Sequence, residues 1–187
     1  MSQDLVGSKT DRTRQEIVAA AIRCWSSDNT ASLGAVADSA GVGRTTLNRY
    51  FSDRTALIAA VDLECRRRFD EAARRARPEE GPGLLALQRI AVEIMQLGEV
   101  LGVIFADNAV VDPDTWYDPE QGHPLNQVVL RGQADGSLAA DLPPQWLITV
   151  VWTSLFAGWL MIKEGNLTWY EVAKLLERTL TSGISPT

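Results

Sequence analysis

Residues 146–162 contain no charged side chain, and their apolar residues point in nearly every direction around a helix. A helix that is apolar on all sides has to be buried on all sides. A membrane span needs about 20 such residues, whereas this run stops at 17 and includes Thr149, Thr153 and Ser154. We therefore expect no membrane span, and the run lies either in the core of the monomer or in an interface with a partner chain.

The other apolar residues also recur at helical spacing, and strand-like alternation is absent throughout. The spacing predicts helices over 11–27, 32–40, 44–51, 52–77, 84–101, 102–111, 125–134, 146–162 and 168–180. Thr168 and Glu171 have the spacing of a capping box at the start of the last helix. Residues 112–124 contain three prolines and are predicted to be a loop. The expected fold class is all-α.

The charge balance changes along the chain. Residues 1–77 carry 13 Lys and Arg against 10 Asp and Glu, whereas residues 78–187 carry 5 against 14. The change coincides with Pro78 and the helix-breaking Gly81-Pro82-Gly83, so a compositional boundary lies there without a flexible linker. A polyanionic partner is expected to meet the N-terminal part.

The N-terminus and the cysteines both favour a cytoplasmic protein. Residues 1–9 have one lysine and no apolar core of an export signal. Cys24 and Cys65 form no CxxC or Cys/His cluster, which is typical of free thiols in a reducing compartment.

Two short helical segments, 32–40 and 44–51, are joined by Gly41-Val42-Gly43, which is the pattern of a helix-turn-helix. The second helix of this motif enters the major groove of DNA. Arginine there can bond guanine and asparagine can bond adenine. The polar face of the second segment consists of Arg44, Thr45, Asn48 and Arg49. A solvated face in a small helical bundle has the same pattern, so both interpretations stay open on this pattern alone.

Residues 32–57 resemble the DNA-binding signature of the TetR family of bacterial transcriptional regulators. Their sequence is Ser32-Leu-Gly-Ala-Val-Ala-Asp-Ser-Ala-Gly-Val-Gly-Arg-Thr-Thr-Leu-Asn-Arg-Tyr-Phe-Ser-Asp-Arg-Thr-Ala-Leu57. The resemblance implies a three-helix DNA-binding domain in residues 1–55. A long helix would join it to a helical ligand-binding and dimerisation domain in residues 56–187. The matching central positions are Ala40-Gly41-Val42, Thr46-Leu47, Tyr50-Phe51 and Leu57.

The resemblance also implies roles for individual residues. Arg44 and Thr45 would face bases, while Thr46 and Tyr50 would fix the helix on the DNA backbone. Arg54 stands where the family usually has a lysine at the start of its fourth helix, and it is expected to contact phosphate together with the N–H groups of that helix. Two departures are Asn48, which replaces a usual tyrosine, and Gly43, which weakens capping. The expected DNA-binding set is Arg44, Thr45, Thr46, Asn48, Arg49, Tyr50 and Arg54.

The same resemblance implies a ligand-released homodimeric repressor on a palindromic operator, because one recognition helix reads only a few base pairs. The expected interface residues on the last two helices are Trp152, Trp159, Leu176 and Leu180, although these helices could instead complete the monomer core. The candidate residues for an effector pocket are Met95, Glu99, Phe105, Trp116, Tyr117 and Phe156, although such residues are more often ordinary core or surface.

Enzymatic function is not expected. His123 is the only histidine, which excludes paired-histidine zinc sites, and no nucleophile elbow or phosphate-binding glycine loop is present. We therefore predict no catalytic residue, metal or cofactor. The alternative function is an all-helical ligand-binding or interaction module with degenerate DNA binding, and salt-sensitive binding to duplex DNA distinguishes the two.

Overall fold

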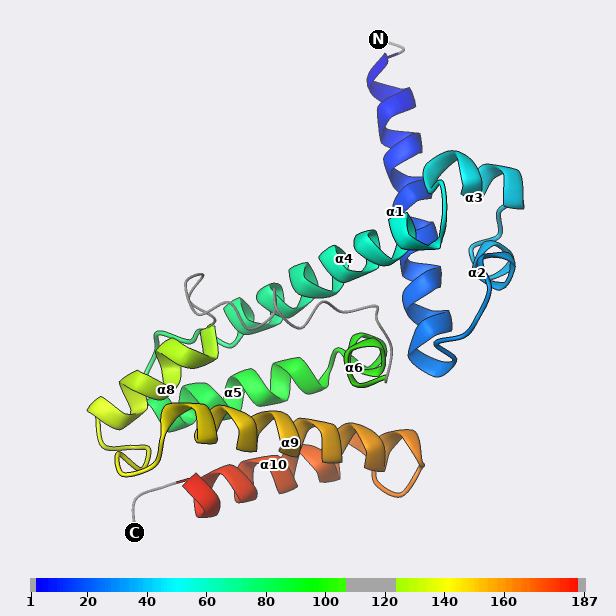
Figure 1. Ribbon diagram of the computed structural model, residues 1–187. Helices are drawn as coiled ribbons and strands as arrows, with labels where there is room; N and C mark the ends of the chain where they lie inside the picture. The colour runs from blue at the N-terminus through cyan, green and yellow to red at the C-terminus, as the bar shows by residue number, and fades with distance from the viewer. Residues whose placement is uncertain (1–2, 107–123, 185–187) are drawn as a thin grey trace. The chain divides into compact units, whose positions relative to one another are not determined.

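A computed structural model of the protein describes residues 3–106 and 124–184, and these residues are helical with short connections (Figure 1). No strand occurs in this part of the chain, as the sequence predicts. The helices are α1 (Gln3–Ser27), α2 (Leu33–Ser39), α3 (Arg44–Tyr50), α4 (Arg54–Arg75), α5 (Gly83–Met95), α6 (Gly98–Phe105), α8 (Pro124–Ala134), α9 (Pro144–Lys163) and α10 (Trp169–Ile184).

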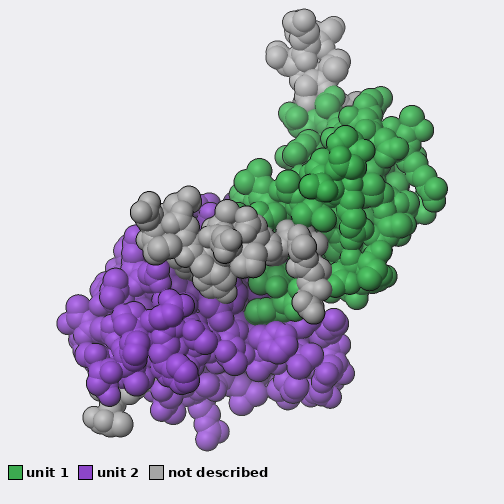
Figure 2. All heavy atoms as spheres, in the orientation of Figure 1, with its two compact units in different colours: residues 1–67, 102–112 green, residues 68–101, 113–187 purple. Residues whose placement is uncertain are grey.

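The chain divides into two compact units (Figure 2). The first unit consists of residues 1–67 and 102–112, and the second of residues 68–101 and 113–187. Helices α1, α2 and α3 therefore lie in the first unit, whereas α5, α8, α9 and α10 lie in the second. Helix α4 begins in the first unit and ends in the second.

The first unit has a core to which several of its helices contribute. Ile17, Trp25, Leu47 and Leu57 are at most 1% exposed. The Ser32 side chain caps α2 by accepting a hydrogen bond from the Ala35 N–H at 3.2 Å, as expected for an N-cap serine. By contrast, α3 begins after Gly43 without a side-chain cap, which confirms the weaker capping expected there.

In the second unit α5 packs against α8, α9 and α10. Its inward side carries Leu87, Ile90 and Ile94, all fully buried. Helices α5 and α8 meet at two glycines: a Cβ on Gly83 would overlap the backbone of Gly132. The absence of side chains at this contact is what allows the two backbones to touch.

The predicted capping box at the start of α10 is confirmed. The Thr168 N–H donates to Glu171 Oε2 at 2.8 Å, and the Glu171 N–H donates to Thr168 Oγ1 at 3.3 Å. Hydrogen bonds to the Glu171 carboxylate, first that from the Thr168 backbone and then that from its side chain, lower the pKa of the carboxyl. Both thiols are free as expected, with Cys65 buried and Cys24 partly buried.

The helix limits differ most from the sequence prediction at α1 and between α5 and α6. Helix α1 begins at Gln3 rather than near residue 11. The segment 84–101 is not one helix, because α5 ends at Met95 and α6 begins at Gly98. Glycine is a poor helix former, and here it marks the start of a new helix. The expected loop lies outside the described residues except for Pro124.

Candidate nucleic-acid interface

Helix α3 has one buried side and one exposed polar side. Leu47 is 1% exposed and anchors the helix to the core of the first unit. Thr46 and Tyr50 flank it and are partly buried. The remaining four side chains of the expected set on this helix are exposed: Arg44, Thr45, Asn48 and Arg49. The structure therefore brings six of the seven expected DNA-binding residues together on one short helix.

An open groove of about 340 Å³ runs between the start of α2 and the exposed side of α3. Two residues of the expected DNA-binding set, Arg44 and Asn48, contribute to its walls. The α2 side of the groove is formed by Ser32, Leu33 and Gly34. Arg49 follows Asn48 along the helix and does not line this groove. Its guanidinium is 5.4 Å from the centre of the Tyr50 ring.

Arg54, which is expected to contact phosphate, has partners within the first unit. Its Nη1 donates to the Ala31 carbonyl and its Nη2 to the Asn29 carbonyl, both at 2.6 Å. The guanidinium also lies over the Trp25 ring, 4.6 Å from the ring centre. In this structure the cation joins the start of α4 to the connection between α1 and α2. These contacts make Arg54 a residue that stabilises the first unit.

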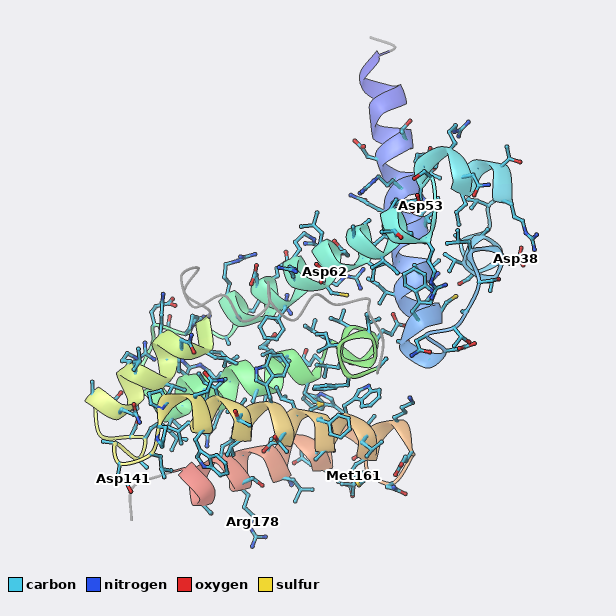
Figure 3. All side chains as sticks on the ribbon, in the orientation of Figure 1. Asp38, Asp53, Asp62, Asp141, Met161 and Arg178 are labelled. Carbon is cyan, nitrogen blue, oxygen red and sulfur yellow. The ribbon has the colours of Figure 1, made fainter. Side chains whose placement is uncertain are left out.

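The N-terminus of α4 is likewise occupied from within the chain. Asp53 precedes the helix, as Figure 3 shows, and its Oδ1 accepts a hydrogen bond from the Ala56 N–H at 2.9 Å. This bond, followed by that from the Ser52 hydroxyl, lowers the pKa of the Asp53 carboxyl. The expectation that N–H groups at this helix start bind phosphate is therefore wrong for the Ala56 N–H. Aspartate immediately before a helix is an N-cap signal, and the sequence interpretation overlooked it.

The four expected interface residues differ in exposure. Leu176 and Leu180 are 4% and 0% exposed, so both are covered within one chain, as in the alternative that they complete the monomer core. Trp152 stacks on Phe69 with ring centres 5.5 Å apart, and it is partly buried. Trp159 is partly buried and lies 6.0 Å from the Phe156 ring.

Helix α9 is not covered on all sides within one chain, contrary to the alternative that it only completes the monomer core. Phe156 is 40% and Trp146 58% exposed. The exposed side of this helix, called the outer stripe of α9 below, consists of Trp146, Thr149, Thr153, Phe156 and Ala157. On α10, the exposed apolar residues are Trp169, Tyr170 and Leu175.

The candidate effector residues do not share one environment. Met95 is 3% exposed, and its Cε would lie 2.9 Å from a Cβ placed on Gly158. Phe105 is partly buried, whereas Glu99 and Phe156 are exposed. These differences in exposure give no single cavity lined by the candidate residues in the described part of the chain. Trp116 and Tyr117 lie outside the described residues.

A groove of about 370 Å³ in the second unit was not expected from the sequence. Its residues come from the end of α4, from α5 and from α10, and they include the ion pair between Arg75 and Glu93 at 3.0 Å. Arg89, which also lines the groove, donates to the carbonyls of Ala76, Arg77 and Glu80. Arg75, Glu93 and Arg89 therefore all have partners within the chain.

Comparison with known proteins gives three concordant findings. Residues 17–61 match the family described as bacterial regulatory proteins, tetR family. The chain is 31% identical over 185 residues to the HTH-type transcriptional repressor LfrR of Mycolicibacterium smegmatis, covering 98% of this chain and 96% of that protein. A crystal structure of the TetR-like transcriptional regulator LfrR from Mycobacterium smegmatis in complex with proflavine matches with a TM-score of 0.74 and 29% identity, covering 94% of this chain and 99% of that one.

A more distant structure agrees on the fold. A TetR family transcription regulator from Marinobacter aquaeolei VT8 matches with a TM-score of 0.77 and 18% identity, covering 96% of this chain and 99% of that chain. At this identity the match supports only the fold.

Proposed function

Because the chain belongs to the tetR family of bacterial regulatory proteins, we propose that it is a homodimeric repressor that binds a palindromic operator and leaves it when a small molecule binds. The observation that carries the proposal is the exposed polar side of α3, which lies opposite the buried Leu47. Regulators of this family bind DNA and small ligands, and the cytoplasm is the proposed location.

In the proposed complex, α3 lies in the major groove. Arg44 and Asn48 line the groove between α2 and α3 and would approach base edges, where arginine pairs with guanine and asparagine with adenine. Thr45 and Arg49 are exposed on the same helix and would contact bases or phosphates. Thr46 and Tyr50 are partly buried, which suits side chains that fix the helix on the sugar-phosphate backbone.

The outer stripe of α9 supports the proposed homodimer. The helix is long and apolar enough to cross a membrane, and 28% of its most apolar window is buried. A single helix of this kind is weak support for a membrane span, and a DNA-binding regulator needs a two-fold partner. An exposed stripe with two large aromatic residues, Trp146 and Phe156, fits a protein interface. We propose that the outer stripe and the exposed apolar residues of α10, which are Trp169, Tyr170 and Leu175, meet the same residues of a second copy.

The effector is proposed to bind in the second unit. LfrR, a relative along almost the whole chain, has been crystallised with proflavine. Residues 78–187 carry 14 acidic against 5 basic side chains, and this balance favours a neutral or cationic ligand. Proflavine is therefore the first probe.

Selection of bound sequences from random duplex DNA at two salt concentrations tests the repressor proposal. We expect one palindromic sequence to be enriched, with weaker binding at the higher salt concentration. Added proflavine is then expected to dissociate the complex with the selected sequence. If the folded dimer enriches no sequence, the alternative of a ligand-binding or interaction module with degenerate DNA binding takes the place of the proposal.

Arg44→Ala is expected to relax specificity at one position in each half-site and to weaken operator binding by about 1–3 kcal/mol per subunit. The reason is the loss of a bidentate contact with one base. Competition titrations with operators altered at single positions measure the effect. Arg178→Ala is the matched control, because Arg178 is exposed on α10 and points away from the helices (Figure 3). If Arg44→Ala loses the same affinity for every altered operator as for the selected one, Arg44 does not contact a base.

Phe156→Arg is expected to convert the protein to monomers, because it places a charge in the outer stripe of α9. Phe156 is 40% exposed, so the change leaves the core of the chain intact. Sedimentation velocity measures the mass. Leu63→Arg is the control, since Leu63 is 66% exposed on α4 and this variant should stay dimeric. If the Phe156→Arg protein stays dimeric, the outer stripe of α9 is not part of the dimer interface.

A further inference from the structure

Gly34 lies directly beneath the side chain of Arg44. A Cβ placed on Gly34 would be 2.8 Å from Nη2 of Arg44 and 3.2 Å from both its Cζ and its Nε. Three atoms of the guanidinium group are thus close to the same point on α2. The group lies across the helix backbone, at a place that only glycine leaves open.

This contact is part of the groove between α2 and α3. Gly34, Arg44 and Asn48 all line it, and Asn48 is one helical turn beyond Arg44 on α3. The groove is open to solvent over the exposed side of α3. The position of the Arg44 side chain within the groove therefore sets the location of its N–H donors before DNA binds.

We propose that Gly34 is a specificity-determining residue of the DNA site. Because Gly34 has no side chain, the guanidinium of Arg44 can lie against α2, and this position sets the direction from which Arg44 approaches its base. This inference rests on the proposed function. An arginine side chain has several rotatable bonds, and binding has to overcome the entropy of ordering them. A seated guanidinium has lost part of this freedom before binding, so less is lost when the base contact forms.

A substitution at Gly34 separates this effect from stability. The atoms that an alanine Cβ would meet belong to the far end of a flexible side chain. The backbone of α2 can therefore stay in place while Arg44 moves. Alanine also favours a helix over glycine, so Gly34→Ala is expected to leave the thermal midpoint unchanged or to raise it. A loss of specificity together with equal or higher stability cannot come from unfolding.

The experiment compares wild type, Gly34→Ala, Arg44→Ala and the double variant on the selected operator and on operators altered at single positions. We expect Gly34→Ala to lower discrimination about 3- to 10-fold at the position read by Arg44 and nowhere else. The double variant should discriminate as Arg44→Ala does. Because Gly34→Ala keeps every charge, the dependence of affinity on salt should stay that of wild type.

Gly98→Ala is the control for a glycine-to-alanine change at a helical position, because nothing lies within 4 Å of a Cβ there. Its discrimination should equal that of wild type. The inference is overturned if Gly34→Ala discriminates like wild type, if it binds more tightly, or if its loss adds fully to that of Arg44→Ala. Failure of the proposed function looks different, since wild type itself would then select no operator.

Discussion

Gly83→Ala is expected to lower the free energy of unfolding of the second unit by roughly 3 kcal/mol or more. The new Cβ would overlap Gly132 Cα and would lie 2.5 Å from Gly132 N and 2.9 Å from the Val128 carbonyl oxygen. All of these are backbone atoms of α8, which cannot move aside as a side-chain end can. Relief requires α5 and α8 to separate, and this opens the core around them.

Two hydrogen bonds make that separation more costly. The Gly83 N–H donates to Asp135 Oδ2 at 2.8 Å, and the Leu84 N–H donates to Ser137 Oγ at 3.0 Å. The turn after α8 therefore supplies acceptors for the first N–H groups of α5, which have no partner within their own helix. Moving α5 away from α8 would leave these groups unpaired as well.

Chemical denaturation followed by circular dichroism measures the effect of Gly83→Ala. Gly98→Ala is the matched control: open space surrounds a Cβ there, and a gain of up to about 1 kcal/mol is expected from helix propensity. Equal denaturation midpoints for the two variants would show that a Cβ at position 83 does not force α5 and α8 apart.

Local signals in the sequence predicted the structure well. Thr168 and Glu171 form the predicted capping box, and the polar residues predicted for α3 are exposed on that helix. Each of these features depends on residues within one or two helical turns. Spacing along the sequence is enough to predict them because a helix fixes the positions of its near neighbours.

Contacts between distant residues could not be predicted in this way. The sequence interpretation treated Gly83 only as a helix breaker, because nothing near it indicates that Gly132 lies against it. Leu176 and Leu180 have the same apolar character as exposed Leu175, and only the packing of α10 shows that they are buried. The site followed the same rule: exposed residues of α3 were predicted, whereas the partners of Arg54 were not.

Arg54→Ala is expected to destabilise the first unit by about 2–4 kcal/mol. The substitution removes two hydrogen bonds from a charged donor, to Ala31 and Asn29, and a cation–π contact with Trp25. Bonds of this kind contribute about 1.5–3 kcal/mol each, and partial exposure lowers the sum. Thermal denaturation measures the loss. Arg49→Ala is the matched control, because Arg49 is exposed on α3 and its removal should change stability little.

Arg54→Lys distinguishes this structural role from a phosphate contact. Lysine supplies a cation to phosphate as arginine does, but its single ammonium group cannot reproduce the planar fork that reaches Ala31 and Asn29 while covering Trp25. If Arg54 holds the unit together, the Arg54→Lys protein should remain destabilised, and its folded form should keep the wild-type dependence of DNA affinity on salt. If Arg54 instead binds phosphate, Arg54→Lys should retain the affinity that Arg54→Ala loses, and Arg54→Ala should lower the salt slope by about one. The two bonds at 2.6 Å favour the first outcome, because they hold the guanidinium against the connection between α1 and α2.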